Sequence, residues 1–182
     1  NARNEIVTTS NNFRDAWLGA QRCIVPMMSF QEDDLRSGKA VPTRITRVDG
    51  KPMGVAGLWE RWRGAGDEEI VSFCLLTVNA NSHALMHRYG PPGSEKRMVA
   101  ILNEGAYGAW LNAAQPEKAR EFMRAYPAEG LTANPIEKKR SGGLPGAAVS
   151  IGGEAPAQAR GRVMDGEWVL EIVATQVDRA SG

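Results

Sequence analysis

The stretch VPTRITRVDGKPMGVAGLWERW (residues 41–62) decides the fold class. Residues 41–47 alternate between apolar and polar side chains, which is the pattern of a strand with one buried face. Asp49-Gly50 is a favoured hairpin-turn pair, and residues 52–62 then return as a second strand. The stretch therefore predicts an antiparallel hairpin and favours a protein built around a β-sheet.

Further strands and a few helices are predicted on both sides of this hairpin. Strands are expected at residues 22–30 (with Pro26 at an edge or a bulge), 69–81, 97–102, 131–136 and 166–177. Helices are expected at residues 13–21 (capped by Asn11 or Asn12), 104–113 (capped by Asn103) and 116–126 (starting at Pro116). A charged turn is expected at residues 32–39 and a Gly/Pro-rich loop at 81–96. Because strands dominate and the helices are segregated, the predicted class is α+β, mostly β, with a mixed, partly closed sheet.

Composition describes an ordinary soluble domain with little overall charge. The chain has 182 residues, and its 22 Lys and Arg against 21 Asp and Glu give a net charge of +1. This balance excludes a strongly basic nucleic-acid wrapper but not a local basic cleft. No apolar stretch approaches the ~20 residues of a membrane span, and no signal peptide is visible. We therefore expect a cytoplasmic protein, a monomer with no contact with membranes.

The positions of the two cysteines and two histidines match no known metal-binding or cofactor-binding pattern. Cys23 and Cys74 both lie in apolar runs, which is typical of small buried hydrophobic residues. They form neither a disulfide framework nor a CxxC pair, and together with His83 and His87 they lack zinc-finger spacing. No phosphate-binding or dinucleotide-binding glycine motif is present. We predict no metal site and no cofactor.

A few polar residues are candidates for chemistry, each with a plainer alternative. Glu32 follows an apolar strand, where a carboxylate can have a raised pKa suited to proton transfer, or can belong to a solvated acidic turn. His83 and His87 stand four residues apart in the loop, either functional or simply exposed.

Two basic segments are the other candidates. Lys96 and Arg97 at the mouth of a strand can hold a phosphate or be ordinary strand-end cations. In Asn1-Ala2-Arg3 the amide and the guanidinium suit recognition of a sugar and a phosphate, while the alternative is a frayed terminus.

The ordered set NARNE, FRDAW, RCIVPMMSFQE, GVAGLWERW, SFCLLTVNAN and KRMVAIL resembles the SOS-response-associated peptidase (SRAP) family. The resemblance runs from Asn1 to about Pro135. It implies a barrel-like, mostly β fold with a positively charged groove for single-stranded DNA. It also implies a place in the DNA damage (SOS) response, covalent crosslinking to abasic sites, and a self-cleaving peptidase (hydrolase) activity. An abasic site is an aldehyde that an amine converts to a Schiff base, which a neighbouring thiol then traps.

The resemblance also implies roles for particular residues. Asn1, Glu32 and His87 match or stand in for catalytic groups, and Arg3, Thr77 and Arg97 for DNA-binding groups. The family histidine of the HxRMP motif falls on Glu95, so either His87 or His83 could take its role, or Glu95 itself. We expect Arg3, Arg97 and Glu32 to share one face.

The family nucleophile is an N-terminal cysteine that lies upstream of the motif at which this sequence starts. We therefore expect residues 1–136 to form an SRAP-like domain lacking its N-terminal catalytic segment. Residues 137–182 are expected to be a Gly/Ala/Pro-rich linker and an extension with one strand. Cys23 and Cys74 cannot replace the nucleophile, since an internal cysteine has no α-amine. Enzyme activity is left open: the alternatives are a degenerate, non-catalytic homologue that binds DNA or has a structural role, and an unrelated β-rich binding protein.

Overall fold

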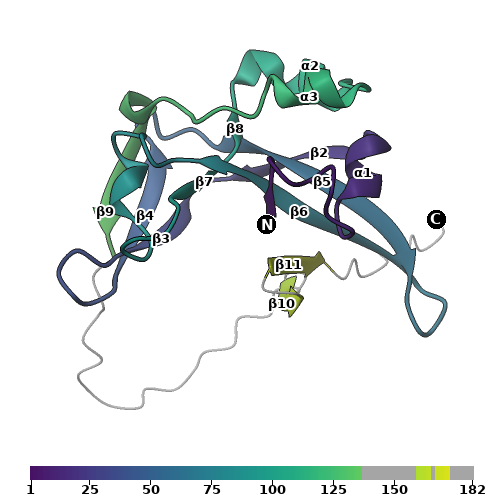
Figure 1. Ribbon diagram of the computed structural model, residues 1–182, viewed down its shortest axis with the longest axis horizontal. Coiled ribbons are helices and arrows are strands. Elements are labelled where there is room, and N and C mark those ends of the chain that lie inside the picture. Colours follow the sequence, from purple (N-terminus) through teal and green to yellow (C-terminus); the bar gives the residue numbers. More distant parts are fainter. Residues whose placement is uncertain (137–158, 165–166, 173–182) are drawn as a thin grey trace, which may run out of the picture.

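Two long antiparallel strands, β5 (Met53–Arg63) and β6 (Glu69–Asn79), form the centre of the fold (Figure 1). The computed structural model describes residues 1–136, 159–164 and 167–172. The larger sheet has the order β10-β11-β6-β5-β2, with β1 and β7 also paired to β6 and β8 to β5. Its other strands are β1 (Ala2–Arg3), β2 (Arg22–Met27), β7 (Arg97–Val99), β8 (Ile101–Leu102), β10 (Ala159–Met164) and β11 (Glu167–Ile172).

A second sheet of three strands lies beside the first and has the order β3-β4-β9. Its members are β3 (Phe30–Asp34), β4 (Val41–Arg47) and β9 (Leu131–Pro135). All pairings are antiparallel except that of β1 with β6, so the larger sheet is mixed. The predicted α+β, mostly β class is confirmed. The described strands form open sheets and do not close into a barrel.

The predicted hairpin of residues 41–62 is wrong, although both of its strands exist. β4 pairs with β3 and β9, while β5 pairs with β2, β6 and β8, so the two strands belong to different sheets. The turn itself forms: Gly50 has a φ of +70°, and Asp49 accepts hydrogen bonds from Lys51 N and from the Arg47 guanidinium. The chain therefore turns at the expected place but passes from one sheet to the other.

The predicted strand 97–102 is broken at Ala100 because it changes partner there. Its first half, β7, pairs with β6, and its second half, β8, pairs with β5. Ala100 N donates to Leu76 O at 2.8 Å, and Ala56 N donates to Ala100 O at 2.9 Å. The segment thus fills the gap where β5 and β6 move apart beyond the Gly57–Leu75 pair.

Two further predictions need correction. Residues 32–34 of the predicted charged turn are strand β3, paired with β4, and only the following residues turn. The helices are shorter than expected: α1 (Arg14–Leu18), α2 (Tyr107–Leu111) and α3 (Pro116–Arg120), none with a side-chain cap hydrogen bond. Residues 104–106 form a 3₁₀ turn, and two others are η1 (Met86–Arg88) and η3 (Ala128–Gly130). The remaining expected strands are present as β2, β6 and β9, with their ends shifted.

The predicted C-terminal extension contains two described strands, β10 and β11, which pair with each other. The strand expected at 166–177 is observed as β11, which pairs with β6 at Phe73 and Ser72. Residues 159–162 of the predicted linker belong to strand β10. The rest of that linker lies outside the described residues, as does the predicted 173–177 end of the strand.

Two tryptophans and a buried arginine anchor the helices to the larger sheet. Trp17 of α1 and Trp110 of α2 are fully buried with ring centroids 6.5 Å apart. The Arg22 guanidinium stacks on both rings, at 4.7 and 5.0 Å from their centroids, and its Nε donates to Ala113 O at 2.8 Å. This stack fixes the helical layer against β2, the strand that carries Arg22.

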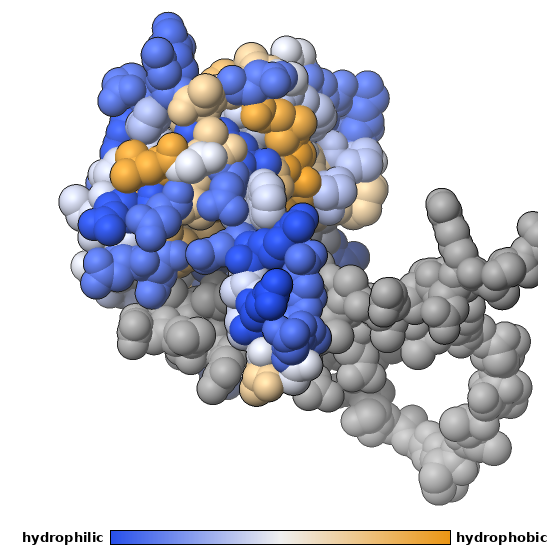
Figure 2. All heavy atoms as spheres, turned by 90° about the vertical axis from the view of Figure 1, so that its right-hand side faces the viewer, coloured by the Kyte–Doolittle hydropathy of each residue, from blue (hydrophilic) through white to orange (hydrophobic). Residues whose placement is uncertain are grey.

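Figure 2 views the molecule from the side of the turn that joins β5 to β6. This face is mostly hydrophilic, and its apolar side chains gather in a few patches. Among the described residues, no helix is both long and apolar enough to cross a membrane.

Candidate functional site

Strand β1 places the N-terminal residues beside Thr77 of β6. Because β1 runs parallel to β6, Arg3 lies opposite Thr77. Thr77 Oγ1 donates to Ala2 O at 3.3 Å, and Asn4 N and Nδ2 donate to Thr77 O at 3.1 and 3.2 Å. Asn1 precedes β1 and is exposed.

Arg97 meets Thr77 from the other side. Its strand β7 pairs with β6, and its Nη2 donates to Thr77 O at 2.7 Å and to Thr77 Oγ1 at 3.1 Å. Arg97 also forms a two-pronged pair with Glu5, at 3.1 and 2.9 Å. With 17% of its side chain exposed, Arg97 is held from two directions. It serves as the anchor of the group that we call the Thr77 cluster: Arg3, Glu5, Thr77, Glu95 and Arg97.

Glu95 joins the two arginines of the Thr77 cluster. One of its oxygens accepts from Arg97 Nη1 at 2.9 Å and from Asn79 Nδ2 at 2.7 Å, and the other lies 3.2 Å from Arg3 Nη1. The hydrogen bonds from Asn79 and then Arg97 lower the pKa of this carboxyl, and the charge of Arg3 adds to the effect. Two guanidinium groups and two carboxylates therefore balance in charge within the cluster.

Glu32 lies apart from the Thr77 cluster in the arrangement of strands. It stands on β3 in the smaller sheet, opposite Thr43 of β4. Phe30, Glu32 and Asp34 share the half-buried face of β3. Burial raises the pKa of the Glu32 carboxyl, with a smaller contribution from the negative charge of Asp33. The chemical property expected of Glu32 is thus present, whereas the expected common face with Arg3 and Arg97 stays a prediction.

His83 is a buried structural residue. Its Nε2 lies 2.7 Å from Tyr126 O and its Nδ1 accepts from Leu85 N and Met86 N at 3.2 and 2.9 Å. Because a carbonyl can only accept, Nε2 carries the proton. Both ring nitrogens are engaged, so His83 is poorly suited to proton transfer with a substrate.

His87 is exposed and lies in a recess of the loop that precedes β7. Its Nδ1 is 2.7 Å from His83 O, which leaves Nε2 directed away from that bond. The recess, which we call the loop pocket, encloses about 480 Å³. Its lining includes Arg36, His87, Arg88, Gly90 and Lys96. Lys96, which lines the loop pocket, stands between Glu95 and Arg97 of the Thr77 cluster in the chain.

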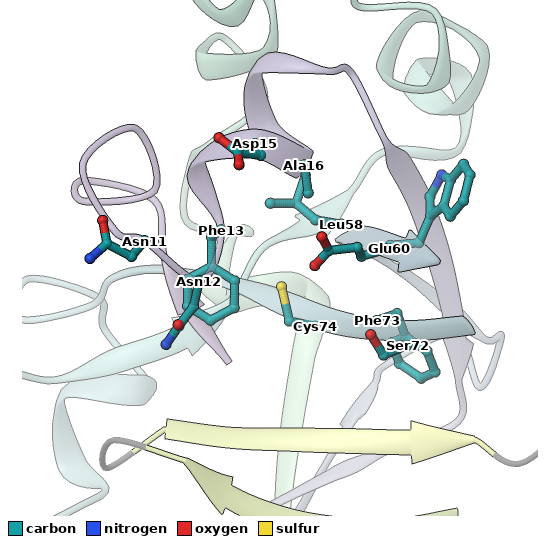
Figure 3. Close-up of a pocket in the computed structure, with 11 residues that line it drawn as sticks. Asn11, Asn12, Phe13, Asp15, Ala16, Leu58, Glu60, Ser72, Phe73 and Cys74 are labelled. Carbon is teal, nitrogen blue, oxygen red and sulfur yellow. The ribbon is translucent and has the colours of Figure 1, made fainter. Parts of the chain in front are cut away.

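Both cysteines are at least partly buried. Burial raises the pKa of the Cys23 thiol to about 11, so the thiolate is scarce at neutral pH. Cys74 is buried at 7% exposure on β6. It lines a hollow of about 300 Å³ between α1 and the two central strands, together with Phe13, Leu58 and Phe73 (Figure 3). Among the described residues, no group of three or more His, Cys, Asp or Glu side chains could hold a metal ion.

Sequence reasoning missed three residues that build the site. Glu5 and Asn4 lie within the NARNE segment, and Asn79 lies within SFCLLTVNAN. Their partners are 92, 73 and 16 residues away in the chain, at Arg97, Thr77 and Glu95 respectively. The quoted motifs contain these residues, but only the pairing of β1 and β7 with β6 shows which of them contact one another.

The site thus consists of two arginines and two carboxylates around Thr77, on an open mixed sheet with a parallel N-terminal strand. A family model described as SOS response associated peptidase (SRAP) matches residues 1–140. The chain therefore belongs to the SRAP family.

Similar proteins agree with this assignment. The abasic site processing proteins YobE of Bacillus subtilis and YoqW of Bacillus phage SPbeta are each 28% identical over 136 residues, covering 73% of this chain and 58% and 57% of theirs. A crystal structure from Bordetella bronchiseptica has a TM-score of 0.72 at 49% identity, covering 75% of this chain and 64% of that one. One from Bacteroides thetaiotaomicron has a TM-score of 0.67 at 25% identity, covering 75% and 57%. The chain thus spans less than two thirds of each relative.

Proposed function

We propose that this chain binds single-stranded DNA at abasic sites as part of a DNA damage response. The main support is that Arg3, Thr77 and Arg97 come from three separate strands and lie together: Arg3 is opposite Thr77, and Arg97 donates a hydrogen bond to it. Membership of the SRAP family supports the proposal, as does the naming of curated relatives as abasic site processing proteins. Localisation in the cytoplasm and action as a monomer belong to the same proposal.

The two arginines have different tasks in this proposal. Arg97 is largely enclosed and is bonded to Thr77 and Glu5, so it positions the cluster. Arg3 has 56% of its side chain exposed and a single ion pair, with Glu95. A DNA phosphate offers the same acceptor geometry as that carboxylate. Arg3 therefore exchanges Glu95 for a backbone phosphate when a strand binds, while Arg97 stays in place.

Covalent capture of the abasic aldehyde is a further part of the proposal, and it requires an amine and a thiol on the same residue. An amine attacks the aldehyde carbon, water leaves to give the imine, and a thiol on the same residue adds to the imine carbon to close a ring. Proton transfers in these steps are assigned to Glu32, whose raised pKa suits the role, and to His87, with Asn1 holding the sugar. The self-cleaving peptidase activity would use the same amine-and-thiol residue.

A second candidate is a homologue that binds abasic DNA without reacting with it. Two observations favour it. Glu95 occupies the place of the family histidine and is fixed by ion pairs to Arg3 and Arg97. Of the two thiols in this sequence, burial raises the pKa of Cys23 to about 11, and Cys74 is buried.

Fluorescence anisotropy with a labelled single strand that carries one abasic site tests the binding. We expect the Arg3→Gln variant to bind several-fold more weakly than the unmodified chain and the salt dependence to become shallower, since one phosphate contact is lost. Arg14→Gln is the matched control, because Arg14 is a similarly exposed arginine that also has one carboxylate partner, Asp15. Equal loss in both variants, or binding that does not respond to salt, would contradict the proposal.

A further inference from the structure

We propose that the loop pocket is a second phosphate-binding site, which takes a backbone phosphate of the same strand that Arg3 contacts. This inference rests on the proposed function and extends it to residues outside the Thr77 cluster. The pocket is proposed to bind a phosphate. We assign this phosphate to the bound DNA strand because the pocket and the Thr77 cluster share the segment of residues 95–97.

The charge of the loop pocket favours an anion. Arg36, Arg88 and Lys96 line it, and none of its lining residues is a carboxylate. Asp34 is the acidic residue that acts on these cations: it accepts both prongs of Arg36, and the charge of Arg88 also contributes to lowering its pKa to about 2. Three cations against one carboxylate leave an excess positive charge, in contrast to the balanced Thr77 cluster.

The loop that forms the pocket is held in place by hydrogen bonds. Gly90 N donates to Asp33 O at 3.1 Å, which ties the loop to β3. Lys96 N donates to Asn81 Oδ1 at 2.7 Å, and Lys96 Nζ donates to Gly90 O and Pro91 O at 3.1 and 2.6 Å. Gly90 adopts a φ of +78°, a conformation that a side chain would strain. The pocket is therefore preformed, which reduces the ordering cost of binding.

The same short segment presents the Thr77 cluster and the loop pocket. Lys96 and Arg97 are adjacent, so their Cα atoms are about 3.8 Å apart. Lys96 reaches back to the loop carbonyls, whereas Arg97 on one side and Glu95 on the other reach to each other and toward Arg3 and Glu5. Residues 95–97 therefore connect the loop pocket to the Thr77 cluster along the chain. That continuity points to a neighbouring phosphate of the same strand.

Arg88 is the residue to change, because it is exposed and its loss leaves the Lys96 bonds to the loop intact. We expect Arg88→Gln to weaken binding of a single strand about fivefold at low salt and to lower the magnitude of the log–log salt slope by about 0.7. Arg88→Lys, which keeps the charge, should restore most of the affinity. Arg63→Gln at the far end of the β5–β6 pair is the matched control and should change little.

Neutral phosphates in the oligonucleotide identify the source of the ligand group. A strand with single methylphosphonate substitutions near its abasic site should bind the unmodified chain more weakly at one substituted position, and Arg88→Gln should be insensitive to that same position. If no position shows this coupling while Arg3→Gln still weakens binding, the pocket proposal is wrong and the proposed function stands. If the unmodified chain fails to bind the strand at all, the proposed function fails as well. If inorganic phosphate binds and Arg88→Gln abolishes that binding without changing DNA affinity, the pocket takes a free phosphate and the assignment to the strand is overturned.

Discussion

Glu95 stands at the position that the resemblance assigns to the histidine of the HxRMP motif. Its carboxylate accepts hydrogen bonds from Asn79 and Arg97 and pairs with Arg3. Because these partners lower the pKa of Glu95, the group stays charged at neutral pH and is a poor proton donor. Under the proposed function, Glu95 competes with a DNA phosphate for Arg3.

Glu95→Gln should therefore strengthen binding of single-stranded DNA. The change removes the competing charge from Arg3 and Arg97 and keeps the shape of the side chain. We expect affinity to rise about threefold at low salt, with a steeper salt dependence, because the freed guanidinium gains a phosphate contact. Glu69→Gln, at an exposed ion pair with Arg61, changes the net charge equally and is the control. Titration of a labelled strand into each variant is the measurement, and equal affinities for the two would contradict the role given to Glu95.

The Glu32 carboxyl is expected to make stability depend on pH in a defined direction. Burial raises its pKa in the folded protein, so the folded state holds this proton over a pH range in which the unfolded chain has released it. The cost of ionising Glu32 is absent below the unfolded pKa of about 4.3 and fully present above the raised folded pKa. Glu32→Gln should thus raise Tm at pH 7, and the difference should disappear near pH 4. A thermal melt series across this range measures it; a difference that grows toward low pH would show that the carboxylate is stabilised.

At the scale of elements, the sequence predicted most strands but not their partners. Alternation in 41–47 and the apolar run in 69–81 marked β4 and β6 correctly, because both patterns are local. The pairing of β4 with β9 and of Arg3 with Thr77 joins residues far apart in the chain, which no local pattern encodes. For the same reason, only the structure shows that Glu5 and Asn79 bond to Arg97 and Glu95.

Gly57 is a position where close strand packing forbids a side chain. A Cβ there would lie 2.7 Å from Cys74 O and 2.8 Å from Cys23 Sγ, at the point where β2, β5 and β6 are paired. We expect Gly57→Ala to reduce the free energy of unfolding by about 2 kcal/mol, since the strands must shift to admit the methyl group.

Gly108→Ala supplies a control of opposite sign. Gly108 lies within α2 and a Cβ there meets nothing within 4 Å, so alanine should stabilise the protein by about 0.5–1 kcal/mol through helix propensity. Urea unfolding of the two variants gives the comparison. Similar midpoints for both would show that the sheet accommodates the extra atom at Gly57.

At the scale of the whole molecule, a polypeptide produced to begin at Asn1 and end at residue 182 should bind abasic DNA without forming a heat-stable adduct. Such a polypeptide has its α-amine on Asn1, whereas its thiols are on Cys23, with a pKa of about 11, and on the buried Cys74. The imine from Asn1 therefore has no thiol on the same residue to trap it. A denaturing gel of the chain mixed with uracil-excised single strand should show no shifted band after heating.

Asn1→Cys is the informative variant in the same gel, because it places an amine and a thiol on one residue beside the Thr77 cluster. We expect a heat-stable band from this variant, unaffected by added Cys23→Ser or Cys74→Ser changes. A stable band from the unmodified chain that Cys23→Ser abolishes would instead make Cys23 the nucleophile.

The meeting of β1, β6 and β7 at Thr77 has a consequence for folding kinetics. Ala2 and Thr77 are 75 residues apart in the chain, and Glu5 and Arg97 are 92 apart. Closing such long loops costs entropy before any contact offsets it, and domains dominated by distant pairings fold in milliseconds to seconds rather than microseconds. Refolding should therefore restore the β2–β5 and β5–β6 pairings before DNA affinity returns. In a refolding experiment, recovery of DNA binding reports the arrival of the N-terminal strand.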